Sequence, residues 1–465
     1  MYQNHMRILK NDLPIGDSFD ILERTIKIGG RNATIFYVDG LTDGLKAQYV
    51  LNYLLAIRKE DMDNVTTSQQ FIEEKLPFLS SQVTFSYDEA QQRMYSGLSI
   101  MVVEGLDKII IIDTRKYPSR SIEEPEKEKS LRGAKDGFTE SFMQNISLIR
   151  RRIRDNNLII KYFPMGSVSK TDIAVAYMKD KVDKALLARI ERLVKKVQTD
   201  YITVGDQSVL EKLMKAMGAY SSFNPFPKVR YSQRPDIIAG HITEGKIAII
   251  VDNSPTVMLL PVGVFDFLQD VDDYYFPQLT GNYFRLLRTI NFLVILFLTP
   301  IYILIIQYKE MTPELLEFFV PKENFAVPIL LQFILLELAI DGLKLASLNT
   351  PSSLGMSLSV IGALILGEFS INSGWFIPQT ILCMAVVALA SFTQPSIELS
   401  YGIKFSRLLM IVGAGLYGIA GFAVGLGISI FVLATTKTLS GDSYLYPLVP
   451  FEWHSLKKLL FRSKE

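Results

Sequence analysis

The distribution of charge along the chain most constrains what it can fold into. Before about residue 285 charges of both signs are dense, whereas four charge-free runs follow at 289–308, 345–367, 369–397 and 408–436. About 20 consecutive apolar residues are enough for a helix to cross a bilayer. The sequence therefore predicts a soluble α/β N-terminal region followed by an all-α polytopic membrane domain at 286–436 and a basic tail at 437–465.

One of these runs has an unusual composition. Residues 349–375 read NTPSSLGMSLSVIGALILGEFSINSGW and combine serines, glycines and an acid with apolar residues. Small and polar residues inside membrane segments usually face other helices or a water-filled path. The candidates for a pore or ion path in this segment are Ser352, Ser353, Ser357, Gly362 and Glu368.

The expected spans conflict with the charge of the tail. They are Thr289–Tyr308, Phe325–Leu345, the polar segment at 350–371, Phe376–Gln394 and 408–436, with Lys404 and Arg407 in a cytoplasmic loop. Five spans that start inside would place the basic tail outside, against the positive-inside tendency. We therefore expect four to five membrane segments, of which 350–371 is re-entrant or broken, because irregular backbone is tolerated where it lines a cavity.

Two further acids lie inside the second span. Glu337 and Asp341 are one helical turn apart and share a face. A carboxylate at the bilayer centre costs about 2.5–3.5 kcal/mol on insertion scales, so both acids should face inward or reach the interface. Asp341 could pair with Lys344 or join Glu337 and Glu368 on an aqueous path.

The soluble region is expected to contain two small α/β subdomains, at 31–115 and 146–285, after a polar arm at 1–30. The first has a helix at 44–58, with Leu45, Tyr49, Tyr53, Leu54 and Ile57 roughly on one face, a second helix capped by Thr66 or Thr67, and a hairpin of strands 98–103 and 108–113. The second has strands at 157–163, 172–178, 236–240, 246–251 and 256–260, and helices at 182–198, 208–217 and 263–270.

A connector at 116–145 separates the two subdomains and contains the motif EPEKEKSLRGAKDGFTE. A basic helix follows at 141–155, with Arg150, Arg151 and Arg152 adjacent in sequence. Two interpretations remain open for these arginines. They form either a solvated helix face with ion pairs between subunits, or a binding site for lipid headgroups or another ligand.

Several functional classes find no support in the sequence. It has no phosphate loop, no G-x-G-x-x-G motif after a strand and no Cys/His cluster with metal-ligand spacing, so neither an enzyme nor a cofactor is expected. No basic stripe with interleaved aromatics suggests a nucleic-acid partner. The N-terminus lacks the regions of a signal peptide, which favours a cytoplasmic N-terminal region.

Several motifs resemble one family. The 124–140 motif is followed by LIRRRI at 148–153, and RPD at 234–236, DNSP at 252–255, DYY at 273–275 and IGAL at 361–364 also match. Together they resemble the A subunits of bacterial spore germinant receptors (the GerA type). Two departures, KLAS at 344–347 and Glu368, make the chain most similar to the stage V sporulation protein AF branch of that family.

The resemblance implies a location and an assembly. Such A subunits sit in the spore inner membrane with the large N-terminal domain on the core side. They are expected to form homo-oligomeric, pentameric ion channels beside a permease-like B subunit, with germinant receptors as further partners. The signature residues assigned to subunit interfaces are Glu124, Glu126, Arg132, Gly133, Gly137, Phe138, Glu140, Arg150, Arg151 and Arg152.

Two functions from different classes follow from these observations. The first is a cation-permeable channel subunit that contributes to ion release during germination, with the acids Glu337 and Glu368 biasing the pore to cations. The second is a non-conducting signalling or scaffold subunit that couples germinant receptors to downstream machinery such as dipicolinate release. A secondary transporter is less well supported, because no matching pair of broken helices repeats in two halves.

Overall fold

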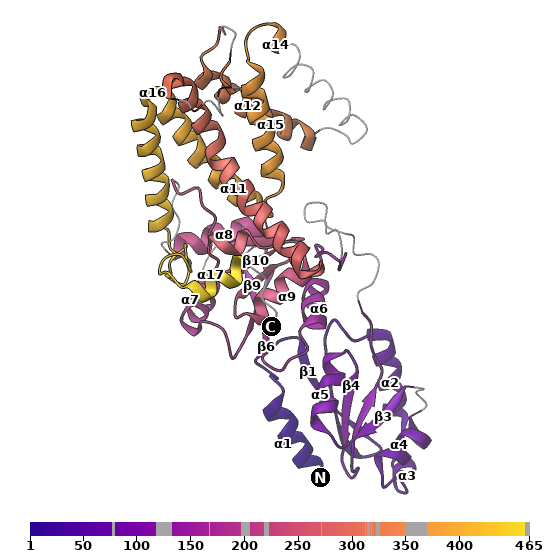
Figure 1. Cartoon of the computed structure of the whole chain (residues 1–465). Coiled ribbons are helices and arrows are strands. Elements are labelled where there is room, and N and C mark those ends of the chain that lie inside the picture. Colours follow the sequence, from indigo (N-terminus) through magenta and orange to yellow (C-terminus); the bar gives the residue numbers. More distant parts are fainter. Residues whose placement is uncertain are drawn as a thin grey trace. The chain divides into compact units, whose positions relative to one another are not determined.

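The computed structural model describes residues 1–76, 80–117, 133–166, 168–196, 205–217, 223–270, 272–311, 313, 317, 319–321, 326–349 and 370–460. The chain divides into two compact units (Figure 1). The first comprises Met1–Tyr220 and Val229–Pro261, and the second comprises Ser221–Lys228 and Val262–Glu465.

The first unit begins with a five-stranded antiparallel sheet in the order β1-β2-β4-β5-β3. Its strands are β1 (Ile21–Ile28), β2 (Arg31–Val38), β3 (Ser81–Thr84), β4 (Ser99–Val103) and β5 (Ile109–Ile112). The helices are α1 (Tyr2–Asp12), α2 (Gly44–Ala56), α3 (Lys59–Met62), α4 (Ser68–Lys75) and α5 (Tyr87–Tyr95). The predicted hairpin of β4 and β5 and the Thr67 cap of α4, which accepts a hydrogen bond from the Gln70 N–H, are confirmed.

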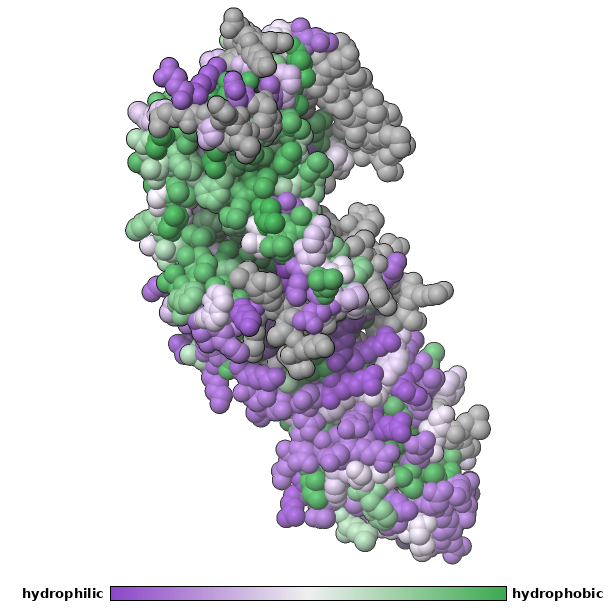
Figure 2. Space-filling model, viewed as in Figure 1, coloured by the Kyte–Doolittle hydropathy of each residue, from purple (hydrophilic) through white to green (hydrophobic). Residues whose placement is uncertain are grey.

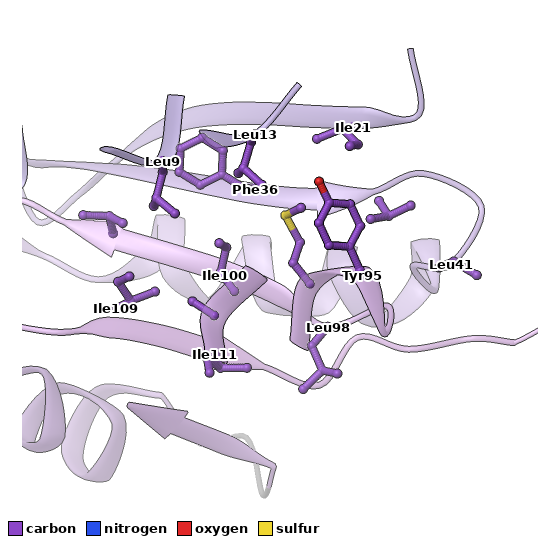
Figure 3. Close-up of a cluster of buried hydrophobic side chains, with 14 of the residues drawn as sticks. Leu9, Leu13, Ile21, Phe36, Leu41, Tyr95, Leu98, Ile100, Ile109 and Ile111 are labelled. Carbon is purple, nitrogen blue, oxygen red and sulfur yellow. The ribbon is translucent and has the colours of Figure 1, made fainter. Parts of the chain in front are cut away.

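Both faces of this sheet are covered by helices. On one face Ile100 and Ile111 pack with residues of α1 and α5, as Figure 3 shows. On the other face Met101 and Ile110 pack with residues of α2, α3 and α4. Because successive strand residues point to opposite faces, the unbroken apolar runs of β4 and β5 serve both cores.

The expectation of a polar arm at 1–30 is wrong. Leu9 of α1 is fully buried, and β1 pairs with β2 along its whole length. Gly29 and Gly30, at φ 52° and 82°, form the two-residue turn between these strands. Glycine suits such a turn because both central residues of a type I′ hairpin turn need positive φ.

The predicted helix at 44–58 is present as α2, but of the residues expected on one face of it only Leu54 and Ile57 pack at the core. Leu45, Tyr49 and Tyr53 are exposed, whereas Val50 and Leu54 are buried. The apolar pattern therefore identifies the helix but not the side that packs on the sheet.

A second five-stranded antiparallel sheet follows, in the order β6-β7-β9-β10-β8. Its strands are β6 (Leu158–Met165), β7 (Thr171–Met178), β8 (Arg230–Ser232), β9 (Ile247–Val251) and β10 (Val257–Leu260). The helices are α6 (Phe142–Arg152), α7 (Lys184–Lys196), α8 (Gly205–Ala216) and α9 (Pro235–Thr243). Counted along the chain, the strand order 1-2-4-5-3 is the same in both sheets, so the unit contains one topology twice.

This repeat explains why the expected strand at 236–240 is wrong. Those residues lie in α9, which precedes β9 as α5 precedes β4. Pro235 occupies the first turn of α9, where its missing N–H costs nothing and its fixed φ favours the helix. The strand in this part of the chain is β8, which is shorter than the expected strand at 236–240 and pairs with β10. The helix expected at 263–270 is a short 3-10 turn, η1 (Val264–Phe267).

The second unit is helical. Its elements after η1 are α10 (Asp272–Tyr275), α11 (Gln278–Gln307), η2 (Lys309–Met311), α12 (Ile329–Asn349), α14 (Ser370–Asn372), α15 (Pro378–Phe392), α16 (Ile397–Thr435) and α17 (Trp453–Leu460). Among the described residues, α11 and α16 are long and apolar enough to cross a membrane. Figure 2 shows hydrophobic residues over these helices, whereas hydrophilic residues predominate on the visible face of the first unit.

The expectation of a single fifth segment at 408–436 is wrong, because α16 folds back on itself at Gly418. This residue has φ 61° and ψ −139°, and it separates helical residues 397–417 from 419–435. A Cβ at Gly413 would overlap the Gly421 carbonyl oxygen, and one at Gly425 would lie 3.1 Å from the Met410 Cα. Glycines permit this close antiparallel packing because they have no side chain.

The hairpin brings the end of α16 back to the end of the unit where α11 begins. Gln307, at the end of α11, donates to the Gly415 carbonyl near the turn, at 3.2 Å. At the opposite end, Asn224 donates to the Thr436 hydroxyl at 2.7 Å, and the Tyr444 carbonyl accepts from the Val264 N–H at 3.0 Å. The basic tail and the start of α11 therefore lie at the same end of this unit.

Helices α12 and α15 run in the same direction. Gln332, near the start of α12, accepts hydrogen bonds from the Ile377 N–H and the Thr380 hydroxyl at the start of α15. Lys344, near the end of α12, lies 5.4 Å from the ring centre of Phe392 at the end of α15. The expected re-entrant segment at 350–371 falls largely outside the described residues.

Candidate functional site

Four charged side chains meet between α12 and α16. The carboxylate of Glu337 binds the Arg407 guanidinium and lies 3.1 Å from the Lys404 ammonium, which also binds Asp341. The acids are four residues apart on α12 and the bases three apart on α16, so each pair lies on one face of its helix. We call these four residues the α12–α16 charge cluster.

The cluster lies beside the apolar run of α11. Glu337 and Arg407 are 4% and 3% exposed. Arg407 also donates to the Ile295 carbonyl oxygen at 3.0 Å. Ile295 comes seven residues after Arg288, roughly 10 Å along the helix axis and inside the apolar run. The four charges are therefore packed within the part of the unit that the sequence assigns to the membrane.

The cluster is electrically balanced, since two carboxylates face two cations. Burial of an ion pair costs desolvation energy, and removal of one partner leaves a buried charge without compensation, typically at a cost of about 3–5 kcal/mol. Among the described residues, Asp341 Oδ1 and Arg407 Nε are buried without a hydrogen-bond partner. Once these charges are buried, each therefore depends on its partner across the two helices, and the cluster keeps unused hydrogen-bonding capacity inside the unit.

One expectation about these residues is wrong, and one of the two interpretations left open for Asp341 is not observed. Lys404 and Arg407 do not mark a loop, because both lie within α16 and their charges are neutralised by α12. Asp341 pairs with Lys404 rather than with Lys344. A signal for this pairing was present in the sequence, since two acids one turn apart match two bases one turn apart on another apolar helix.

A second buried cluster lies at the start of α11. Asp273 accepts from Arg285 at 3.2 Å and from Arg288 at 2.9 Å. Arg288 also donates to the Leu268 carbonyl at 3.2 Å. Because α11 begins at Gln278, both arginines lie within this helix, before the expected span at 289–308. Their side chains attach the DYY motif to the first turns of that helix.

Arg150 does not belong to a solvated face, which corrects that expectation for this residue. It is fully buried and binds both oxygens of Asp20, at 2.7 and 2.9 Å. It also donates to the Ser18 hydroxyl at 3.0 Å and to the Leu158 carbonyl at 3.1 Å. The side chain thus joins the residues before β1 to β6. Burial raises the pKa of the nearby Tyr95 phenol, although the Arg150 guanidinium opposes this shift.

The other two arginines have different surroundings. Arg152 binds Asp136 of the signature motif at 2.6 Å. Arg151 is exposed, with its guanidinium 4.5 Å from the ring centre of Tyr117. An interface role for these residues stays a prediction, and Arg151 is the one of the three that is exposed on this chain.

The structure places part of the signature motif. Gly137 and Phe138 are buried, and the Phe138 N–H donates to the Gln233 carbonyl at 2.8 Å. Gly133 and Glu140 are exposed, and the Glu140 carbonyl accepts from the Asn253 N–H at 3.1 Å. The predicted residues outside the described parts of the chain are Glu124, Glu126, Arg132, Ser352, Ser353, Ser357, Gly362 and Glu368. Within the described residues, no group of three or more His, Cys, Asp or Glu side chains could hold a metal ion.

Comparison with known proteins identifies the family. Stage V sporulation protein AF of Bacillus subtilis is 35% identical over 456 residues, covering 98% of this chain and 91% of that protein. Spore germination protein KA of Bacillus subtilis is 30% identical over 454 residues, covering 96% and 82%. Spore germination protein B1 of the same organism is 27% identical over 468 residues, covering 99% and 94%.

Among solved structures, one match is the N-terminal domain of the A subunit of the Bacillus megaterium spore germinant receptor GerK3. It is 25% identical with a TM-score of 0.41, and the match covers 55% of this chain and 92% of that one. The model of the Bacillus/Clostridium GerA spore germination protein family matches residues 8–465. The resemblance drawn from the sequence motifs is confirmed, and the chain belongs to the GerA family of spore germination proteins.

Proposed function

We propose that this chain is a subunit of a homo-oligomeric ion channel in the spore inner membrane, with the pentamer as the expected assembly, and that it contributes to cation release during germination. The observation that carries the proposal is the α12–α16 charge cluster, buried beside the apolar run of α11. Ionisable groups inside membrane segments are costly and usually mark an ion path or a moving element. A helical unit that served only as an anchor would need no such group.

In this proposal the paired arrangement of the cluster corresponds to the closed state of the channel. While Glu337 is paired with Arg407 and Lys404, the balanced charges give cations no net attraction. A displacement of α16 from α12 would free both carboxylates of α12. Rings of carboxylates from several subunits select cations in other channels. The serines at 352, 353 and 357, with Gly362 and Glu368, remain the proposed lining of the rest of the path.

The first unit is proposed to set the geometry of the oligomer on the core side. Arg151 is exposed, and the acidic residues Glu124 and Glu126 of a neighbouring subunit are its proposed partners. A permease-like B-subunit-type protein and germinant receptors are the proposed further partners, since relatives of this chain are named as germination proteins and one as a receptor A subunit.

The membrane topology is part of the proposal. Since α12 and α15 are parallel, the end of α12 and the start of α15 lie at opposite ends of the helical unit. Because α16 folds back at Gly418, it contributes two crossings in place of the one expected for 408–436, and the total number of crossings becomes even. The N-terminal region and the basic tail then share the core side, in agreement with the positive-inside tendency.

One observation favours the second candidate, a non-conducting scaffold that couples germinant receptors to dipicolinate release. Each of the four charges of the cluster is paired, which also suits a permanent brace between two helices. The brace would hold the helical unit in one shape for a partner to recognise.

Conductance of the purified full-length protein in planar bilayers tests the proposal, with and without a co-expressed permease-like partner. Cation-selective currents that rise in Arg407→Gln, because two carboxylates then face a single lysine and the cluster becomes net negative, support the channel. The matched variant Lys27→Gln, on an exposed residue of β1 outside the cluster, should leave currents unchanged. If the folded, oligomeric protein shows no conductance with or without the partner, and Arg407→Gln shows none either, the scaffold is favoured.

A further inference from the structure

The segment after α16 presents apolar side chains outward. Five residues between 445 and 454 are 42–66% exposed, namely Tyr446, Leu448, Val449, Phe451 and Trp453. A contiguous exposed group of large apolar residues usually marks an interaction site. We call residues 445–453, which end at the first residue of α17, the C-terminal aromatic loop.

This loop is held in place rather than loosely attached. Tyr444, just before it, is fully buried and donates to the Pro227 carbonyl at 2.7 Å. Within the loop, the Glu452 N–H donates to the Pro447 carbonyl at 2.9 Å, and the Tyr446 hydroxyl binds the Glu452 carboxylate. Phe451 and Trp453 lie with ring centres 6.3 Å apart. These bonds fix the apolar side chains in an outward position.

The loop continues the apolar surface of the proposed membrane span. It follows the end of α16, where Ile428, Ile430 and Phe431 are also exposed. Figure 1 shows α17 beside the lower end of the yellow half of α16. Because this end is also where α11 begins, the loop lies at one boundary of the apolar layer.

The composition of the loop matches the chemistry of a membrane interface. Tryptophan and tyrosine concentrate at the headgroup level, where their rings are buried and their polar atoms remain solvated. The chain has two tryptophans, and they lie at opposite ends of the helical unit. Trp375 precedes the start of α15, whereas Trp453 opens α17. Lys437 and Lys457 are exposed beside the loop and supply positive charge.

We infer that the C-terminal aromatic loop binds the headgroup layer of the leaflet at which α11 begins, and that Lys437 and Lys457 give it a preference for anionic lipids. Trp453 and Phe451 insert at the boundary between headgroups and acyl chains, and the lysines contact lipid phosphates. The inference rests on the proposed insertion of the helical unit into a membrane but not on ion conduction.

Fluorescence quenching of the full-length protein in vesicles tests this inference. Trp375→Phe leaves Trp453 as the single tryptophan, and Trp453→Phe leaves Trp375. In phosphatidylcholine–phosphatidylglycerol vesicles, acyl chains brominated near the headgroup should quench Trp453 more strongly than chains brominated near the methyl end. Absence of lipid quenching at Trp453, while Trp375 is quenched, overturns the inference. If neither tryptophan is quenched, the helical unit is not inserted and the proposed function fails with it.

The lysines are tested by lipid selectivity. The ratio of Trp453 quenching by brominated phosphatidylglycerol to that by brominated phosphatidylcholine reports the preference for anionic lipid. Each of Lys437→Gln and Lys457→Gln should lower the preference of the loop for phosphatidylglycerol over phosphatidylcholine by about fivefold. This factor is equivalent to about 1 kcal/mol, the contribution of one lysine near an anionic surface. Lys27→Gln, on an exposed position of β1, is the matched control and should change nothing. If neither brominated lipid nor aqueous acrylamide quenches Trp453, a second copy of the chain or another protein covers this residue. That result also contradicts the inference.

Discussion

Glu337 of α12 and Arg407 of α16 form a buried ion pair between residues 70 positions apart, and the Ile295 carbonyl of α11 binds the same arginine. Three helices of the second unit thus meet at one guanidinium. The significance of this pair comes from its burial in an apolar layer.

Glu337→Gln should destabilise the helical unit by about 3–5 kcal/mol, because the buried Arg407 loses its balancing charge. The double variant Glu337→Leu/Arg407→Leu should recover most of that loss, since it removes both charges. Unfolding of the full-length protein in detergent measures all variants, including Arg407→Leu. Strictly additive effects in this double-mutant cycle would show that the two side chains do not interact.

Gly421→Ala should lower stability by about 1–3 kcal/mol, the usual cost of overpacking. Its Cβ would overlap the Gly413 carbonyl oxygen across the hairpin of α16. Gly427→Ala is the matched control, because a Cβ at Gly427 has nothing within 4 Å. The melting temperature in detergent compares the two. Equal effects of the two substitutions would mean that the two halves of α16 are not in contact.

Arg150→Lys should destabilise the first unit by about 1–3 kcal/mol. Lysine keeps the charge but cannot bind both oxygens of Asp20 and the Leu158 carbonyl together. The adjacent Arg151→Lys, on an exposed residue, should cost less than about 1 kcal/mol. Denaturant unfolding of the full-length protein gives both free-energy changes. A smaller loss of stability at position 150 than at position 151 would contradict the role of Arg150 as a buried link between Asp20 and Leu158.

Stability of the first unit should fall as pH decreases below about 6.5, the ordinary pKa of histidine. Burial lowers the pKa of His241, while its hydrogen bond to Glu244 opposes this shift. The unfolded chain therefore binds a proton at a higher pH than the folded chain, so stability is fully present above that pH and decreases below it.

His241→Gln should weaken this dependence, because glutamine does not titrate. Thermal unfolding between pH 5 and pH 8, compared with the wild-type protein, measures the difference. An unchanged slope in the variant would assign the pH dependence to other groups.

Cysteine accessibility should place Ser347 and Ser373 on opposite sides of the membrane, since they lie at the end of α12 and before the start of the parallel α15. Cys383→Ala first removes the single native cysteine. Ser347→Cys and Lys437→Cys should then react with an impermeant maleimide from the same side, and Ser373→Cys from the other. Labelling of Ser347→Cys and Ser373→Cys from one side would support the re-entrant segment instead.

Much of the fold follows from local patterns. The Thr67 cap, the hairpin of β4 and β5 and the apolar runs of α11 and α15 were all predicted, because each depends on residues within a few positions of one another. The family also follows from short motifs, such as the 124–140 segment and the arginines after it. The repeated strand order was not predicted, since β8 has only three residues and the two halves share topology rather than an evident sequence period.

By itself, the sequence determined where charge is absent, and therefore which part of the chain is helical and apolar and which part is α/β. Only the tertiary structure decided which charges are neutralised. The sequence allowed a solvated position for Arg150 beside Arg151 and suggested a loop position for Arg407. In the structure Arg150 is buried against Asp20, and Arg407 is buried against Glu337. The physical reason is that the cost of a buried charge depends on its partner, and these partners are separated from the arginines by 130 and 70 residues.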